Sequence, residues 1–242
     1  MIRRLNLIFA ILMLPLVGCQ SGPTPAAGLS GLRLTVIAEP KAGVKDAGGR
    51  VGVYDTPAVK EHGQFERVDY SALDDIVVWA QPAFPMLRQP MLPPLTIEVS
   101  AKKSVENLTA AGSIGQRLIV HNNGSATGNF YSVSDGNEFD LGSIPAGGRG
   151  EYTIKSGGLI EILSASAKDP VAQVYAATSR WVALTHSDAT VDFTDLPPGQ
   201  YKIYSWHPRL PGTEMNVTLL PNQVAKVSIK VGVNALPKVG PR

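Results

Sequence analysis

The sequence predicts an all-β protein built from sandwiches. Past residue 31 the apolar residues recur with a period of two, most clearly at residues 225–231, where alanine, valine and isoleucine alternate with lysine and serine. Such alternation gives a strand one buried face and one wet face. Clusters of Gly, Asn and Pro divide the chain at short intervals, and many short strands between such turns are typical of β-sandwiches.

The individual strands follow from the same pattern. Alternation predicts strands at residues 32–36 and 95–99, and denser apolar runs at residues 76–80, 118–120 and 159–163 predict strands covered on both faces. Turns are expected at residues 46–49, 122–124, 146–148, 156–158 and 197–199. One short helix is expected at residues 101–111, through Val105 and Leu108.

Residues 1–18 have the features of a lipoprotein signal peptide. Arg3 and Arg4 precede an apolar segment, residues 5–16, that is too short to span a bilayer. The tetrapeptide Leu-Val-Gly-Cys that ends at Cys19 resembles the lipobox of bacterial lipoproteins, which implies a diacylglycerol on the Cys19 thiol and a partner in membrane lipid. An ordinary signal peptide with a chance cysteine is the alternative.

The residues after Cys19 are also typical of a lipoprotein. Residues 19–30 are small, contain two prolines and predict a flexible tether. Gln20 stands where an aspartate often retains lipoproteins at the inner membrane, so the expected location is the outer membrane, facing the periplasm or the cell exterior.

Charge and cysteine content exclude several function classes. The chain has 22 Lys+Arg against 20 Asp+Glu, and removal of Arg3 and Arg4 with the signal leaves 20 of each. A neutral surface offers no electrostatic footprint for nucleic acid. Cys19 is the single cysteine, so the acylated chain would have no disulfide, thiolate nucleophile or Cys-ligated metal.

The stretch at residues 191–208 carries the first resemblance to a known family. An apolar strand, a Pro-Pro-Gly turn at residues 197–199, an aromatic-rich strand and Trp206-His207-Pro208 follow in order. This pattern resembles a carboxypeptidase-regulatory-like (transthyretin-like or prealbumin-like) β-sandwich, as found in bacterial plastocyanin-like or methylamine utilization proteins. The turn would form an arch between two strands.

Residues 95–176 resemble a cupredoxin-like Greek-key sandwich. The carrying motifs are His121-Asn122-Asn123 after an apolar strand, and then the segments at 129–132 and 139–142. A blue-copper site needs two imidazoles, a thiolate and usually a weak axial Met. The resemblance places these four ligands at Gly128, Ser164, Ala167 and Pro170, none of which can supply the expected donor. The resemblance therefore implies a scaffold that lost its copper, with no metal and no cofactor.

The resemblance also implies a domain order. Residues 31–94 and 177–233 would form one discontinuous sandwich into which the cupredoxin-like domain, residues 95–176, is inserted. Residues 82–94 hold five prolines and would connect the two. Residues 234–242 would be a disordered tail.

Tyr204, Trp206 and His207 are the candidate ligand-binding residues. Alternation puts Tyr204 and Trp206 on one strand face and Tyr201 and Ile203 on the other, so one pair at most could offer a stacking platform to a sugar. Trp181 is a further aromatic candidate. The competing interpretations are core packing for these aromatic rings and a strand-end histidine for His207.

The spacing of the remaining polar clusters does not match a metal-binding or catalytic motif. His62, His121 and His186 are scattered, and neighbours such as those at residues 185–188 cannot easily form a catalytic triad. Asp135, Glu138 and Asp140 would be either Ca²⁺ ligands or solvated turn carboxylates. No catalytic constellation is apparent, which favours a non-enzymatic binding or structural lipoprotein with a protein or glycan partner. A plastocyanin-like copper electron carrier is the alternative.

Overall fold

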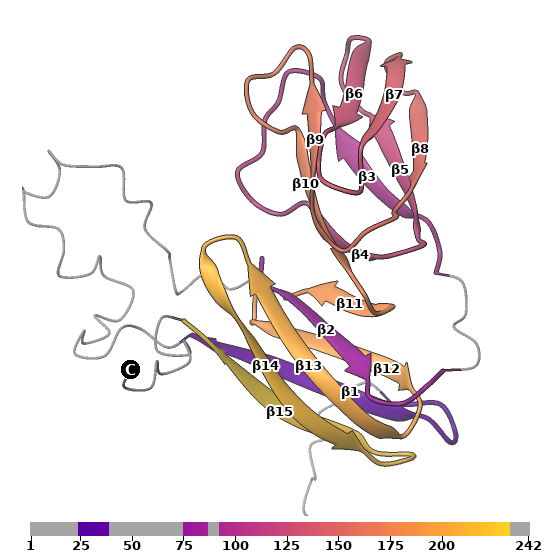
Figure 1. The fold of residues 1–242 in the computed structure, drawn as a ribbon, viewed down its shortest axis with the longest axis vertical. Helices are drawn as coiled ribbons and strands as arrows, with labels where there is room; N and C mark the ends of the chain where they lie inside the picture. Colours follow the sequence, from indigo (N-terminus) through magenta and orange to yellow (C-terminus); the bar gives the residue numbers. More distant parts are fainter. Residues whose placement is uncertain (1–23, 39–74, 87–91, 233–242) are drawn as a thin grey trace, which may run out of the picture.

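The computed structural model describes residues 24–38, 75–86 and 92–232, and these residues form fifteen strands and no helix. The all-β prediction is confirmed. The strands make four sheets, which group into two units that each enclose a hydrophobic core. Figure 1 shows the two units one above the other.

The terminal unit comes from the two ends of the described chain. Its sheets have the orders β12-β1-β15 and β11-β2-β13-β14. All pairings are antiparallel except β1 with β15. The strands are β1 (Ser30–Ala38), β2 (Val77–Pro82), β11 (Trp181–Leu184), β12 (Thr190–Leu196), β13 (Gly199–His207), β14 (Leu210–Leu219) and β15 (Val224–Val231).

The central unit is formed by the chain between β2 and β11. Its sheets have the orders β4-β10-β9-β6-β7 and β3-β5-β8. The pairs β4–β10 and β3–β5 are parallel, and the others are antiparallel. The strands are β3 (Leu95–Val99), β4 (Ala110–Ser113), β5 (Arg117–Asn122), β6 (Gly128–Ser132), β7 (Phe139–Ile144), β8 (Arg149–Thr153), β9 (Gly158–Ser164) and β10 (Ala172–Ala177).

Alternation in the sequence decides which strand face is buried. Leu32, Leu34 and Val36 of β1 are at most 3% exposed, because the period of two turns them all toward the terminal core. On β14, Met215 packs against that core, while Glu214 accepts a hydrogen bond from Lys202 Nζ. The strands expected at residues 32–36, 95–99 and 225–231 are all present.

The arch expected at the Pro-Pro-Gly turn joins the two sheets of the terminal unit. β12 pairs with β1 in one sheet and β13 pairs with β2 in the other. Gly199 takes φ 150°, and a Cβ there would lie 2.5 Å from Cε1 of Phe84. Only glycine allows the strand and the Phe84 ring to approach this closely.

The helix expected at residues 101–111 is wrong. Ala101 belongs to the central core and Leu108 is 8% exposed. The backbone amides of Val105 and Thr109 donate to the carbonyls of Pro170 and Gln173. These amides are therefore used between segments and not in i→i−4 bonds, so this stretch runs as turns into β4.

Two further expectations need correction. The runs at residues 118–120 and 159–163 are buried on one face only, since Ile119, Leu159 and Leu163 are partly exposed. The tether also ends earlier than expected: Ser30 is the first residue of β1, and Gly28 N–H donates to Asn222 Oδ1. The segment around Asn222 therefore holds the chain before β1.

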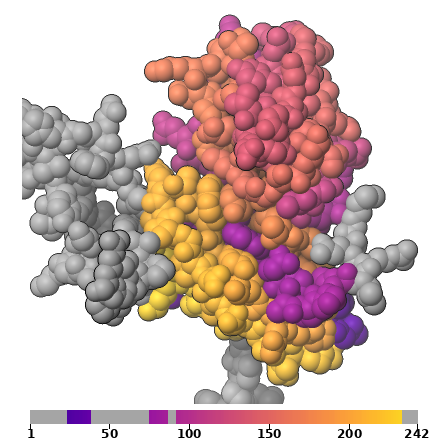
Figure 2. Space-filling model, in the orientation of Figure 1, coloured from indigo at the N-terminus to yellow at the C-terminus, as the bar shows by residue number. Residues whose placement is uncertain are grey.

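The two units touch along β4 and β11 and over the outer face of β2. Figure 2 shows their atoms in direct contact, with no gap between the central unit and the strands below it. No helix within the described residues is long and apolar enough to cross a membrane. The signal segment at 1–18, Cys19, the turn at 46–49, His62 and the tail at 234–242 lie outside the described residues.

Candidate functional site

The four positions that the cupredoxin resemblance assigns to copper ligands lie at the ends of neighbouring strands. Gly128 begins β6 and Ser164 ends β9, which pairs with β6 through Phe130 and Ser164. Ala167 follows in the turn after β9, where its N–H donates to Ser164 O. Pro170 precedes β10, and its carbonyl accepts the Val105 N–H.

This region is packed with hydrocarbon. A Cβ at Gly128 would lie 2.7 Å from both Cζ of Phe130 and Cβ of Ala101, and the Phe130 side chain is fully buried. Ser164 is 3% exposed, and its Oγ accepts the Ser166 N–H at 3.3 Å. A single hydroxyl is the only side-chain donor among the four positions, so these residues do not fit copper.

The other acidic and histidine side chains of the described part of the chain are spread apart. No three His, Cys, Asp or Glu side chains gather there as a ligand set. The carboxylates of Glu138 and Asp140, considered for Ca²⁺, accept the backbone N–H groups of Gly136 and Gly142 instead. The first contact lies in the β6–β7 turn and the second within β7.

Asn122 holds the loop beside the Gly128 region. Its Nδ2 donates to the carbonyls of Ala126 and Ile144, both at 2.9 Å, and its Oδ1 accepts the Gly124 N–H. The side chain is fully buried. Each buried amide atom thus has a partner, which gives this loop one conformation.

Asn137 has a similar role at the opposite turn. Its Oδ1 accepts the backbone N–H groups of Lys155 and Ser156, and its Nδ2 donates to Ser156 O at 2.9 Å. Asn137 is 1% exposed. Sequence reasoning missed this residue, because an asparagine in a polar turn does not reveal that it is buried.

His207 is buried and bound on both ring nitrogens. Nδ1 accepts the Arg209 N–H at 3.1 Å, and Nε2 lies 3.2 Å from Asp75 Oδ2. Since Nδ1 accepts, the proton is on Nε2, which donates to the carboxylate. Burial lowers the pKa of His207, although Asp75 opposes this shift. The contact is therefore a hydrogen bond from a neutral ring at pH 7 and it fastens the end of β13 to the start of β2.

Tyr204 and Trp206 point away from the terminal core, as alternation predicts, and stack on other aromatic rings. Tyr204 stacks on Trp79, with centroids 5.0 Å apart and planes 16° apart. Trp206 stacks on Tyr175 of the central unit at 4.2 Å and 28°. The ring face that each presents to its neighbour is therefore occupied by the chain itself.

Trp79 and Tyr175 complete this aromatic cluster and were not among the sequence candidates. Their centroids lie 5.6 Å apart. Trp79 Nε1 is buried and has no hydrogen-bond acceptor in the described structure. Desolvation raises the pKa of Tyr175. The sequence does not reveal this cluster, because it does not show the register of β2 on β13, which puts Trp79 opposite Tyr204.

Trp181 and Tyr201 belong to the core. Tyr201 is 1% exposed, and its hydroxyl donates to Pro197 O at 2.8 Å across the arch. Burial, with a further contribution from Asp195, raises the pKa of Tyr201. Trp181 contacts Tyr201 edge-on, and its Nε1 donates to Asp195 Oδ1. Neither ring is open to a ligand.

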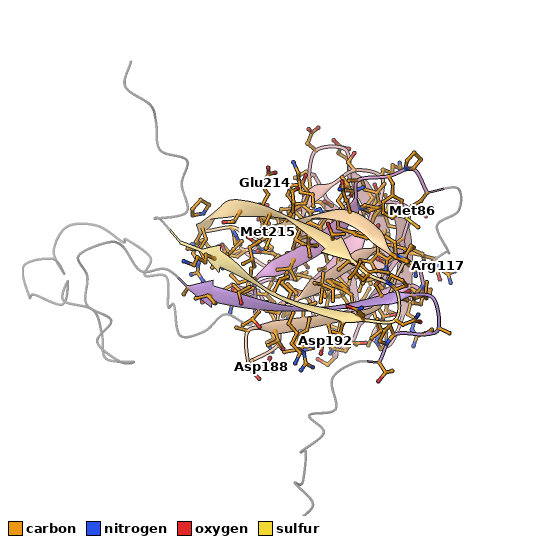
Figure 3. All side chains as sticks on the ribbon, turned by 90° about the horizontal axis from the view of Figure 1, so that it is seen from below. Met86, Arg117, Asp188, Asp192, Glu214 and Met215 are labelled. Atoms are coloured by element: carbon orange, nitrogen blue, oxygen red, sulfur yellow. The ribbon has the colours of Figure 1, made fainter. Side chains whose placement is uncertain are left out.

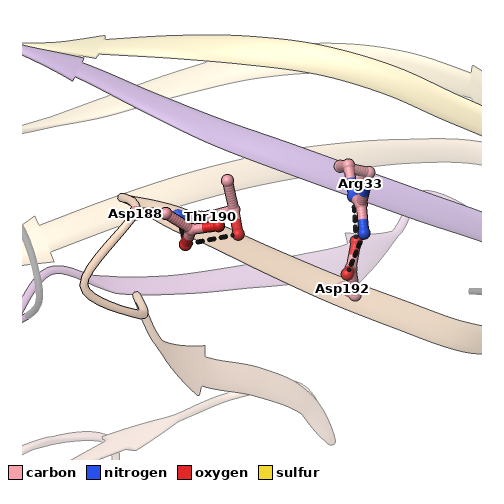
Figure 4. Close-up of polar contacts among 4 residues, drawn as sticks. All are labelled: Arg33, Asp188, Thr190 and Asp192. Carbon is pink, nitrogen blue, oxygen red and sulfur yellow. Dashed lines mark hydrogen bonds and ion pairs between the residues drawn. The ribbon is translucent and has the colours of Figure 1, made fainter. Parts of the chain in front are cut away.

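Asp188, from the candidate segment 185–188, and its neighbour Asp192 hold a turn and a strand pair. Asp188 Oδ1 accepts both the N–H and the hydroxyl of Thr190, and the side-chain bond to Thr190 is the main cause of its lowered pKa. Asp192 binds Arg33 through two hydrogen bonds across β1 and β12. Figure 4 shows both contacts, and Figure 3 shows the two carboxylates at the same edge of the molecule.

His121 and His186 lie apart from His207. His121 Nδ1 is 2.6 Å from Glu98 Oε2 on the outer face of the β3-β5-β8 sheet. The His186 N–H donates to Thr190 O in the turn before β12. The residues at 185–188 belong to that turn, where Asp188 accepts hydrogen bonds from Thr190.

No model of a protein family matches the chain, and no curated protein matches it either.

Proposed function

We propose that this protein is a membrane-anchored, extracytoplasmic lipoprotein that acts as a non-catalytic binding or structural module toward a protein or glycan partner. The observation that carries the proposal is the packing around Gly128. The ring of Phe130 fills the space that a ligand side chain at this position would need. The packed residues around Gly128 then stabilise the central unit, and we propose that a partner binds to the protein surface instead.

The sheet arrangement supports a scaffold of two β-sandwich domains. β2 pairs with β11 and β13, which follow the central unit in sequence, as an interrupted regulatory-like sandwich requires. The central unit carries its own core. We assign it as a cupredoxin-like sandwich without copper, inserted between residues 94 and 177.

A copper titration tests the proposal against its alternative, an electron carrier. Cu(II) is added to the full chain in detergent, and visible absorption is recorded with and without the metal. We expect no intense thiolate-to-copper band and no stoichiometric retention after gel filtration, because none of the four positions offers sulfur or imidazole. An intense band would replace the binding module with an electron carrier.

The partner class is tested by binding. The full chain in detergent is applied to a glycan array and, separately, to crosslinking in intact cells. Binding of one glycan class, or a crosslink to one envelope protein, supports the proposal and separates the two partner classes. Loss of glycan binding in Trp206→Ala but not in Tyr131→Ala would show that glycan binding depends on Trp206. No binding in either assay and no phenotype of deletion would contradict it.

A further inference from the structure

We infer that Tyr175, by packing on aromatic rings of the terminal unit, holds the two units at one fixed angle, so that the described chain behaves as a single rigid body. The junction cluster consists of Trp79, Tyr204 and Trp206 of the terminal unit and Tyr175 of the central unit. This goes beyond the proposed function, because it assigns the aromatic residues a mechanical role and states how any partner surface is presented.

The geometry of the junction cluster is the first argument. Tyr175 contacts two residues of the other unit, Trp206 at 4.2 Å and Trp79 at 5.6 Å between centroids. Trp79 in turn stacks on Tyr204 at 5.0 Å. Aromatic pairs at these separations attract beyond the burial of area. Tyr175 thus lies between Trp79 and Trp206 and joins the four rings into one continuous row.

Burial on the outer face of β2 is the second argument. Ile76, Val78 and Ala80 face the terminal core, so alternation turns Val77 and Trp79 away from it. Val77 is nevertheless fully buried. An outward-facing valine with no exposure means that the face it lies on is covered, and the junction with the central unit lies on that face.

The connection between β10 and β11 is the third argument. The Ser179 hydroxyl donates to Ala80 O at 2.5 Å, and Ser179 is 1% exposed. The Thr178 hydroxyl donates to Gln81 Oε1 at 3.0 Å. The segment that would act as a hinge is therefore bound to β2 at two successive residues. A change of angle would break these bonds and remove Tyr175 from its two partners.

Native-state hydrogen exchange with mass spectrometry on the full chain in detergent tests whether Tyr175 holds the two units together. The variant is Tyr175→Ala, and the readout is the exchange rate of peptides covering residues 177–183. We expect exchange about tenfold faster or more, since two ring contacts are lost from the closed arrangement. Tryptophan emission should shift to the red, because Trp79 and Trp206 lose their cover.

Three further variants decide the outcome. Tyr175→Phe keeps the ring and should behave as the wild type. Trp206→Leu removes the stack from the terminal side and should accelerate the same peptides, even if Tyr175→Ala fails to fold. Tyr131→Ala removes a tyrosine from β6, on the same outer sheet face, and should leave residues 177–183 unchanged. Unchanged exchange in both Tyr175→Ala and Trp206→Leu, or equal acceleration in Tyr131→Ala, would overturn the inference.

Discussion

His207 is bound to Asp75, a residue 132 positions earlier in the chain. The strand-end interpretation of Trp206-His207 describes its position, and the structure adds a hydrogen bond that no local pattern indicates. Because burial lowers its pKa, His207 resists protonation in the folded state. The histidine therefore links folding to pH.

Stability should fall when the pH drops below 6.5, the ordinary pKa of histidine. Between that value and the lowered folded pKa, the unfolded chain binds more protons at this position, so the free energy of unfolding rises with pH in this window. The slope from one proton is at most about 1.4 kcal/mol per pH unit. Urea denaturation at pH 7.5, 6 and 5 measures it.

His207→Gln is the control for this prediction, since glutamine donates to Asp75 but does not titrate. Its stability should depend less on pH across the same window, whatever its absolute value. An equal pH dependence in wild type and His207→Gln would show that other groups are responsible.

Gly128 should tolerate no side chain while Phe130 is present. Gly128→Ala places a Cβ 2.7 Å from the Phe130 ring, and overpacking of this kind costs about 1–3 kcal/mol. In a Phe130→Leu background the same substitution should cost less, because the ring is gone. A double-mutant cycle by urea denaturation measures the coupling, and strictly additive effects would contradict the packing described here.

At the scale of elements, loops in the central unit are held by buried amide side chains rather than by local turn patterns alone. Asn122 is the last residue of β5, and its Nδ2 donates to carbonyl groups of later segments, including Ile144 at the end of β7. The sequence predicts a turn at residues 122–124, and the structure shows why the first asparagine is needed. It supplies a donor where three carbonyl oxygens converge.

Asn122→Asp should destabilise the protein by about 3 kcal/mol or more, because a buried carboxylate would face carbonyl oxygens with no donor. The loss should shrink as the pH falls, since a protonated acid can donate again and its folded pKa would be raised. Denaturation at pH 7.5 and 5 measures both effects.

Asn123→Asp is the matched control, because Asn123 is the exposed neighbour. It should change the free energy of unfolding little at either pH. If it were as destabilising as Asn122→Asp, the effect would come from added charge in the loop and not from the lost donor.

At the scale of the whole molecule, the proposed lipid attachment would decide where the two units work. The thiol of Cys19 is the chain's single sulfhydryl, and two or more acyl chains are needed for lasting membrane association. Cys19→Ser should abolish incorporation of labelled palmitate into the chain expressed in a bacterium. Fluorography of the immunoprecipitated protein measures this, and label retained in the Cys19→Ser chain would contradict the anchor.

The sequence by itself determined that the chain is all-β, where most strands and turns lie, and which strand faces are apolar, because a period of two and the turn residues are local properties. It also predicted that Tyr204 and Trp206 share one face. It misplaced a helix at residues 101–111, where backbone amides bind a distant segment.

Only the tertiary structure decided what those faces touch. Strand register put Trp79 beside Tyr204, and the docking of the central unit put Tyr175 on Trp206. The same is true of Phe130 against Gly128 and of His207 beside Asp75. Each of these contacts joins segments that are distant in sequence or depends on side-chain volume, and neither property can be read from a local pattern.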